Sequence, residues 1–318
     1  MSTPLIETRG LRKYFPTPNG MLHAVDGVDI RIDKGSTLGV VGESGCGKST
    51  LGRTILRLIE PTGGDVRFDG QIINGYDGRR MKQMRKHMQI IFQDPFTSLN
   101  PRMTVSEIIA EPMIVTKACT RKKDLMERVY DLMKIVGLAE RFINTYPHEL
   151  DGGRRQRIGI ARALALSPDF IVCDEPVSAL DVSIQAQILN LMMDLQDQMG
   201  LTYMFITHDL SVVKHISDNI AVMYLGQCVE SAPSEALFAN PIHPYTRALL
   251  EAIPVPNLRH RKEIKVIQGE VSSPIEPKPG CRFAPRCPYA DAACADPHIK
   301  LQETAPQHFV ACVKAGLV

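Results

Sequence analysis

The feature that most constrains this sequence is a glycine-rich loop at residues 42–50, which reads GESGCGKST. Its glycines allow successive backbone N–H groups to turn toward one centre and form a nest for an anion. The pattern predicts an apolar strand before the loop, at Thr37–Val41, and a helix after it, at Lys48–Leu58, whose N-terminus also favours phosphate. The candidate nucleotide-binding residues are Gly42, Glu43, Ser44, Gly45, Cys46, Gly47, Lys48, Ser49 and Thr50.

Two side chains of the loop and two later carboxylates predict the chemistry of the site. Lys48 brings a positive charge toward the β- and γ-phosphates of ATP, and the Ser49 hydroxyl suits Mg²⁺. The apolar strand Phe170–Cys173 ends directly before Asp174 and Glu175. We expect Asp174 to hold Mg²⁺, directly or through water, and Glu175 to polarise the attacking water.

The hydrophobic pattern predicts an α/β fold. Short strands are expected over residues 1–35, and the segment from 169 to 207 reads as strand, helix and strand, which is typical of a parallel βαβ unit. We expect a P-loop NTPase core with an antiparallel β N-terminal part, a helical insertion at about 100–165, and a small Cys-rich C-terminal appendage. The predicted helices are 105–116, 121–136, 154–166 and 183–199, and the predicted strands include 88–92, 169–173, 202–207 and 220–225.

A change in composition near Pro254 predicts a domain boundary. Prolines recur from that point to the end of the chain, together with four of the eight cysteines. We therefore expect an ATPase domain at 1–252 and a C-terminal tail at 253–318.

Composition and charge exclude several other classes of protein. Of the 318 residues 44% are hydrophobic and 23% are charged, and the net charge is +2, which gives no electrostatic case for binding nucleic acid. The longest apolar runs are too short to cross a bilayer, and the N-terminus lacks the apolar core of a signal peptide. We expect a cytoplasmic protein, for which any contact with a membrane must go through a partner.

Further motifs, in order along the chain, show that the sequence resembles the nucleotide-binding subunits of ABC transporters. Gln93 matches the Q-loop, Asp181 ends the D-loop segment SALD, and His208 matches the switch histidine. Tyr14 lies where the family stacks an aromatic ring on adenine, although Phe15 is adjacent. The resemblance implies that Gln93, Glu175 and His208 serve hydrolysis, with Gln93 also contacting Mg²⁺ and water.

The signature motif departs from the family pattern. It reads LDGGR at residues 150–154, where the family typically has LSGGQ. In the family this loop reaches the γ-phosphate of ATP bound to the opposite ATPase. A carboxylate there repels phosphate, but aspartate is also a good helix N-cap, and a neighbouring arginine can offset its charge. The residues concerned are Asp151, Gly152, Gly153 and Arg154.

A finer resemblance concerns the dipeptide, oligopeptide and nickel branch of ABC importers. Residues 240–250 read NPIHPYTRALL, and residues 93–101 contain QDP followed by SLNP, as in that branch. The resemblance implies a second ATPase subunit, two integral membrane permease subunits and an extracytoplasmic solute-binding protein as partners. The alternatives are a soluble ABC ATPase that is not coupled to transport, and a subunit that binds ATP without hydrolysing it; the transported solute stays open.

The four tail cysteines suggest a metal site. Four thiolates suit a [4Fe–4S] cluster or Zn²⁺. Their wide, uneven gaps differ from the paired C-x2-C of common zinc folds, and similar tails in this importer branch include some that carry an iron–sulfur cluster. A tail without metal is the other alternative, and His298 and His308 are either spare ligands or surface residues. The candidate ligands are Cys281, Cys287, Cys294 and Cys312.

Overall fold

The structure is a computed structural model that describes residues 3–252, 269 and 272–316. The chain divides into two compact units. Unit 1 contains the residues up to 32, residues 37–74 and everything from 207 onward, and unit 2 contains residues 33–36 and 75–206. The predicted boundary between 252 and 253 lies at the edge of the described residues and stays a prediction.

The N-terminal part of unit 1 is an antiparallel sheet, as predicted, but its strands are longer than expected. Its order is β2-β1-β4-β5. The pairing of β1 with β2 shifts register three times between Thr8 and Tyr14, so one long hairpin with bulges looks like several short strands in the sequence. The strands are β1 (Ile6–Thr17), β2 (Gly20–Ile32), β4 (Gly63–Phe68) and β5 (Gln71–Ile72).

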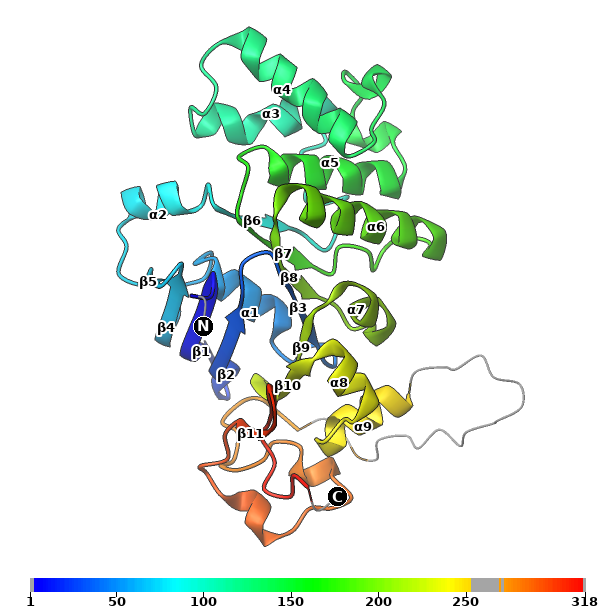
Figure 1. Cartoon of the computed structure of the whole chain (residues 1–318). Coiled ribbons are helices and arrows are strands. Elements are labelled where there is room, and N and C mark those ends of the chain that lie inside the picture. The colour runs from blue at the N-terminus through cyan, green and yellow to red at the C-terminus, as the bar shows by residue number, and fades with distance from the viewer. Residues whose placement is uncertain (1–2, 253–268, 270–271, 317–318) are drawn as a thin grey trace, which may run out of the picture. The chain divides into compact units, whose positions relative to one another are not determined.

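A second set of strands in unit 1 carries the phosphate loop (Figure 1). Its order is β11-β12-β10-β9-β3, with β3 parallel to β9 and the remaining pairs antiparallel. These strands are β3 (Thr37–Val41), β9 (Asn219–Tyr224), β10 (Gln227–Pro233), β11 (Gln302–Ala305) and β12 (His308–Val310). The helices of this unit are α1 (Lys48–Ile55), α7 (Leu210–Ile216), α8 (Ser234–Ala239) and α9 (Pro244–Glu251), with short 3-10 helices at Ala284–Arg286 and Ala292–Ala295.

The described part of the tail, residues 272–316, is part of unit 1 rather than a separate appendage. Phe283 of the tail is 1% exposed and packs in the core of this unit, with its ring 5.4 Å from those of both Tyr224 and Tyr245. Strand β12 pairs with β10. The tail is therefore joined to the rest of unit 1 by the buried Phe283 ring and by the pairing of β12 with β10. Neither contact can be predicted from the local sequence of the tail.

A buried carboxylate also joins the tail to unit 1. Glu230 in β10 is 0% exposed, and its oxygens accept hydrogen bonds from the backbone N–H groups of Ile242 and His243 at 2.8 and 2.9 Å. The Nε2 atom of His308 lies 2.7 Å from the same carboxylate. His308 is thus a buried partner of Glu230 rather than a surface residue or spare metal ligand, while His298 is exposed.

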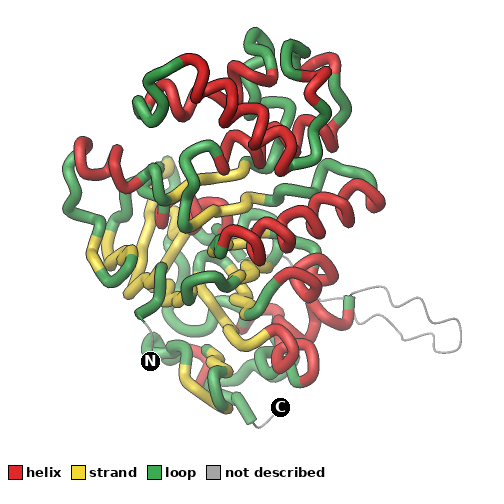
Figure 2. Tube along the Cα trace, turned by 45° about the horizontal axis from the view of Figure 1, so that its top comes forward, coloured by secondary structure: helices red, strands yellow, loops and turns green. Residues whose placement is uncertain are grey.

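Unit 2 contains a short parallel sheet, and it has helices in the range 100–165 where the helical insertion is predicted (Figure 2). Its strands are β6 (Met88–Ile91), β7 (Phe170–Asp174) and β8 (Thr202–Ile206), in the order β8-β7-β6. Its helices are α2 (Gly78–Met84), α3 (Val105–Val115), α4 (Lys122–Ile135), α5 (Gly152–Leu164) and α6 (Val182–Met199), with 3-10 helices at Glu140–Phe142 and Pro147–Glu149.

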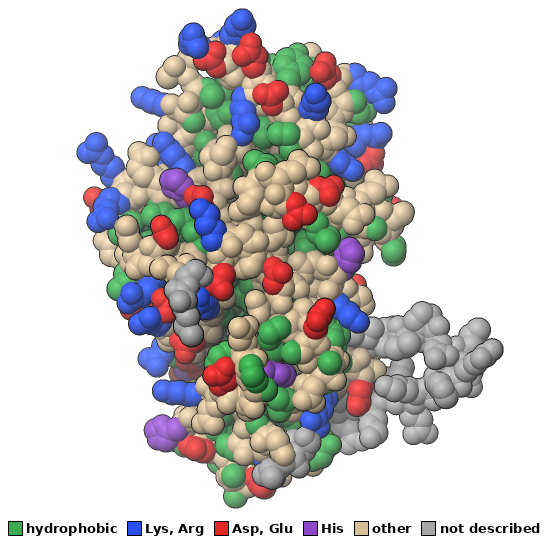
Figure 3. All heavy atoms as spheres, viewed as in Figure 1, with side chains coloured by type: hydrophobic (Ala, Val, Ile, Leu, Met, Phe, Trp, Pro, Cys, Tyr) green, Lys and Arg blue, Asp and Glu red, His purple; other side chains and the backbone are tan. Residues whose placement is uncertain are grey.

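The surface of the protein carries charged side chains of both signs. On the face drawn in Figure 3, basic and acidic side chains are interspersed. Within the described ranges, none of the helices is both long and apolar enough to span a bilayer.

Candidate functional site

The glycines of the phosphate loop (residues 42–50) have backbone positions that exclude a side chain. Gly42 has φ of 152°, and a Cβ atom there would lie 2.1 Å from the carbonyl oxygen of Met223. Gly47 has φ of 102°, and its Cβ would lie 2.0 Å from the carbonyl oxygen of Ala24. Both positions require glycine because of backbone conformation and close approach together.

Lys48 has its ammonium group at the phosphate loop. The side chain is 5% exposed, and Nζ donates to the carbonyl oxygens of Gly42 at 2.7 Å and Glu43 at 2.9 Å. Lys48 also opens helix α1, whose N-cap residue Gly47 supplies no side chain to the first amides. Burial raises the pKa of the neighbouring Cys46 thiol, so this residue stays neutral beside the loop. The unit therefore offers backbone amides and one cation to an anion.

Tyr14 lies in a small network in unit 1. Its ring stacks on His23 with centroids 3.9 Å apart and planes at 15°, and its hydroxyl donates to Asp26. Burial and then the hydrogen bond to Asp26 raise the pKa of Tyr14 to about 12. His23 therefore covers one face of the Tyr14 ring. The neighbouring candidate, Phe15, has the Lys13 ammonium 4.8 Å from its ring centroid.

Unit 2 brings two predicted catalytic residues together. Glu175 follows β7, and Gln93 follows β6; the Gln93 Nε2 atom donates to Glu175 Oε2 at 3.0 Å. Glu175 has φ of 47°, a left-handed conformation that costs a non-glycine residue about 1–3 kcal/mol and is concentrated at functional sites. Its backbone N–H donates to the carbonyl of Ile206, and its own carbonyl accepts from the Ser178 hydroxyl. These contacts hold the strained residue in place.

The other predicted residues lie at element ends. Asp174 is the last residue of β7 and is 1% exposed. Asp181 is the exposed N-cap residue of α6 in unit 2. His208 is exposed in unit 1, two residues before α7 begins. The grouping of these residues into one reaction stays a prediction.

In the signature loop (residues 150–154), the aspartate caps a helix and the neighbouring arginine offsets its charge. Asp151 caps α5, because its Oδ1 atom accepts from the backbone N–H of Arg154 at 2.9 Å. The Arg154 guanidinium also pairs with Asp151 Oδ2. The helix therefore begins at Gly152, two residues earlier than predicted, since the cap overrides the low helix propensity of Gly152 and Gly153.

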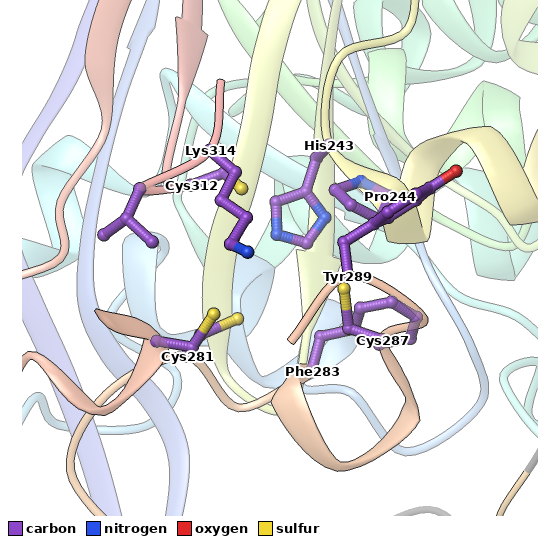
Figure 4. Close-up of a pocket in the computed structure, with 10 residues that line it drawn as sticks. His243, Pro244, Cys281, Phe283, Cys287, Tyr289, Cys312 and Lys314 are labelled. Atoms are coloured by element: carbon purple, nitrogen blue, oxygen red, sulfur yellow. The ribbon is translucent and has the colours of Figure 1, made fainter. Parts of the chain in front are cut away.

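The four tail cysteines line one pocket in unit 1, which we call the cysteine pocket (Figure 4). Burial raises the pKa of the Cys281 thiol to about 11. Burial also raises the pKa values of the Cys287 and Cys312 thiols. Among the described residues, however, no group of three or more His, Cys, Asp or Glu side chains is arranged to hold a metal ion. The predicted cluster is therefore not confirmed.

His243 also lines the cysteine pocket and has an unsatisfied nitrogen. It is 1% exposed, and its Nδ1 atom accepts a hydrogen bond from the backbone N–H of Tyr245 at 3.1 Å. Burial lowers the pKa of His243 to about 4, so the ring is neutral at pH 7 and its proton lies on Nε2. Within the described part of the chain, this Nε2 atom has no hydrogen-bond partner. Sequence reasoning missed His243, because a histidine in the segment NPIHPYTR gives no sign of where its ring points.

The glycine-rich loop that ends at the N-terminus of α1 is typical of a P-loop nucleoside triphosphatase. Comparison with known families narrows this class. The ABC transporter family matches residues 25–178, and the family described as oligopeptide/dipeptide transporter, C-terminal region, matches residues 229–294.

Curated relatives match over nearly their whole length. A putative peptide import ATP-binding protein of Brucella ovis is 52% identical, covering 99% of each chain. The oligopeptide transport ATP-binding protein AppF of Bacillus subtilis is 51% identical, with 97% of this chain and 96% of AppF covered. The dipeptide transport ATP-binding protein DppF of Haemophilus influenzae is 49% identical, with 98% and 97% covered.

Solved structures give the same class. A dimeric bacterial ABC transporter cassette has a TM-score of 0.66 at 29% identity, covering 72% of this chain and 98% of that one. A subunit of an ABC transporter complex from Clostridium perfringens has a TM-score of 0.67 at 26% identity, covering 75% and 92%. The chain belongs to the ATP-binding subunits of ABC transporters and carries the oligopeptide/dipeptide transporter C-terminal region.

Proposed function

We propose that this chain is the ATP-hydrolysing subunit of an importer for dipeptides or oligopeptides. The observation that carries the proposal is the presence, in one chain, of an ABC ATPase match and an oligopeptide/dipeptide transporter tail match. The relatives described above are named for peptide, oligopeptide and dipeptide transport. Their names support neither a nickel solute nor a role outside transport.

The proposed reaction divides between side chains of both units. Lys48 and the amides of the phosphate loop bind the β- and γ-phosphates, and Glu175 polarises the attacking water, held at its carboxylate by Gln93. His208 stabilises the transition state of hydrolysis as a further polar group. Tyr14 stacks on the adenine ring.

A magnesium ion fits the proposed site by donor chemistry. The Ser49 hydroxyl and the Asp174 carboxylate are hard oxygen donors of the kind that Mg²⁺ prefers. When bound, the ion neutralises charge that develops on the phosphates. Asp174 is nearly fully buried and is the last residue of β7.

We propose that this chain pairs with a second ATPase subunit and meets the membrane through two permease subunits, at the cytoplasmic face. A solved ATP-binding cassette of similar fold is dimeric and holds ADP and phosphate. In such a pair the signature loop of each chain faces ATP bound by the other. An extracytoplasmic solute-binding protein would deliver the peptide.

The experiment is to co-express the chain with its neighbouring transporter genes and reconstitute the complex in vesicles with the solute-binding protein. We expect ATP-dependent uptake of a labelled dipeptide or oligopeptide, and weak hydrolysis from this chain alone at any concentration. Full ATPase activity from the isolated chain, independent of concentration, would contradict the shared site. Hydrolysis by the complete complex without uptake of any peptide would contradict the solute class.

We also propose a [4Fe–4S] cluster in the cysteine pocket. A single zinc ion needs four sulfurs within about 2.3 Å of one point, whereas each thiolate of the cluster binds a different iron, so the sulfurs lie farther apart. Four thiols line one pocket, and four thiolates are the ligand set of such a cluster. The buried Nε2–H of His243 also suits an acceptor such as a cluster sulfur.

Anaerobic purification tests the cluster. We expect a brown protein with about four irons per chain. Cys287→Ser should lose the colour, while Cys119→Ser, at a cysteine outside the pocket, should keep it. Stoichiometric zinc without iron, or a colourless protein without metal, would contradict this proposal and leave the ATPase assignment untouched.

A further inference from the structure

Two arginines of the tail bury their charges against the N-terminal part of unit 1. Arg282 follows Cys281, and Arg286 precedes Cys287. Their side chains are only 6% and 7% exposed. Buried guanidinium groups require charged or polar partners, and both arginines find carboxylates more than 240 positions away in the sequence.

Arg286 contacts the phosphate loop itself. Its Nη1 atom donates to the two carboxylate oxygens of Glu43 at 2.9 and 3.2 Å, and to the Tyr224 hydroxyl at 3.3 Å. The backbone N–H of Glu43 donates to the Tyr245 hydroxyl at 2.9 Å, and the Glu43 carbonyl accepts from Lys48. The carboxylate, the backbone N–H and the carbonyl oxygen of Glu43 thus each have a hydrogen-bond partner. The carbonyl oxygen orients Lys48, which binds phosphate in the proposed function.

Arg282 reaches the residues around Tyr14. Its guanidinium pairs with Asp26 and donates to the carbonyl oxygen of Leu225. Asp26 in turn accepts from the Tyr14 hydroxyl and lies 3.1 Å from His23 Nδ1. Arg282 therefore holds the carboxylate that fixes the Tyr14 ring.

We infer that Arg282 and Arg286 are positioning residues for ATP: Arg286 fixes the phosphate loop through Glu43, and Arg282 fixes the adenine-facing Tyr14 through Asp26. The inference rests on the proposed ATP site. Because each arginine is the chain neighbour of a cysteine in the cysteine pocket, any change in that pocket that moves the backbone also moves both contacts. The tail is then a means of setting nucleotide affinity, in addition to its packing in unit 1.

A purely structural role makes a different prediction from a positioning role. A pair that only holds the tail would change thermal stability when broken, and would leave nucleotide affinity unchanged in the folded protein. A positioning pair changes affinity, and it does so in the part of the nucleotide that each arginine serves. Arg286 should affect the binding of every triphosphate, including inorganic tripolyphosphate, while Arg282 should affect only ligands that carry a base.

The experiment measures nucleotide dissociation constants and steady-state kinetics of the assembled transporter. Arg286→Gln should weaken the binding of ATP and of inorganic tripolyphosphate alike by roughly 10-fold, as expected for a lost hydrogen bond to a charged group, and should raise KM more than it lowers kcat. Arg286→Lys should restore part of the affinity. Arg282→Gln should weaken the binding of ATP and leave the binding of tripolyphosphate, which has no base, unchanged.

A double-mutant cycle shows whether Arg286 acts through Glu43. If it does, Glu43→Gln combined with Arg286→Gln is no worse than the single variants. Glu43→Gln also keeps the test available if the arginine variants do not fold. Lys300→Gln, at an exposed tail position, is the matched control and should behave like the wild type.

The outcomes separate this inference from the proposed function. Unchanged dissociation constants in folded arginine variants and in Glu43→Gln overturn the inference, even where the melting temperature falls. Wild-type complex that neither binds nor hydrolyses ATP overturns the proposed function instead. Additive losses in the double variant overturn the route through Glu43.

Discussion

The phosphate loop and the signature loop both end in a helix N-terminus, but their caps differ. Helix α1 begins after Gly47, an N-cap residue that has no side chain to cap the helix. Helix α5 begins after Asp151, whose carboxylate accepts from the Arg154 amide and pairs with the Arg154 guanidinium. The N-cap residue of the first helix is therefore uncharged, while the second helix already holds an anion of its own.

This difference has a consequence for the proposed pair of ATPases. In the proposed pair, the ATP bound by this chain would face a helix whose N-cap residue, Gly47, carries no side chain. The ATP bound by the partner would face a capped helix with a neutralised carboxylate. Both side chains of the Asp151–Arg154 pair are more than one third exposed, so solvent weakens the repulsion that an unpaired carboxylate would cause. We expect the two ATP sites to be unequal, with the partner's ATP bound but hydrolysed more slowly.

The largest expected effect comes from adding a side chain at the phosphate loop. Gly47→Ala places a Cβ atom against the Ala24 carbonyl in a left-handed conformation, so the loop must move. We expect ATP affinity to fall by roughly 100-fold or more, measured by equilibrium binding to the folded complex, because the clash and the strain together amount to about 3 kcal/mol or more. Binding close to that of the wild type would show that the amides of the loop are not where ATP binds.

A smaller effect is expected at the signature loop. Arg154→Ala leaves the Asp151 carboxylate without its partner, and we expect hydrolysis of the ATP bound by the second ATPase to fall several-fold. Asp151→Ser together with Arg154→Gln should instead raise it, since the neutral cap no longer opposes phosphate. The measurement is ATP turnover with the catalytic glutamate of this chain removed by Glu175→Gln. If both sites hydrolyse ATP equally and Arg154→Ala changes neither rate, the predicted inequality of the two sites is wrong.

The smallest expected effect comes from adding a side chain at a glycine inside helix α5. Gly159 lies inside α5, and a Cβ atom there would meet open space among the described atoms. Gly159→Ala should therefore stabilise the helix by about 0.5–1 kcal/mol and raise the melting temperature by a few degrees at most. A loss of activity in this variant would mean that α5 must bend or approach another backbone during the reaction.

The sequence predicted the phosphate loop and the βαβ part well, because their signals are local. The strand Thr37–Val41 was placed to the residue, and helix 183–199 was placed to within one residue of α6. Glu175 and Gln93 were predicted as separate functional residues, but their hydrogen bond was not, since the spacing of 82 residues gives no distance.

The tail could not be predicted in the same way, because its contacts are all long-range. The pairing of Glu230 in β10 with Val310 in β12, and the burial of Phe283, depend on residues far away in the sequence. The same holds for Arg282 and Arg286, which read as ordinary charged residues beside cysteines. Helix α5 begins and ends two residues earlier than the predicted range 154–166, because paired glycines suggested a break at its start and the Asp151 cap outweighed them.

The most direct test of the account compares hydrolysis at the two ATP sites of the assembled transporter by removing one catalytic glutamate at a time. Glu175→Gln should bind ATP normally and lose roughly 10²- to 10⁴-fold in hydrolysis at this chain's own site. Removal of the partner's catalytic glutamate should leave most of the turnover, and Glu127→Gln, at an exposed position of α4, should change nothing. Turnover in Glu175→Gln equal to that of the wild type would contradict the central claim that this chain hydrolyses ATP at its own phosphate loop.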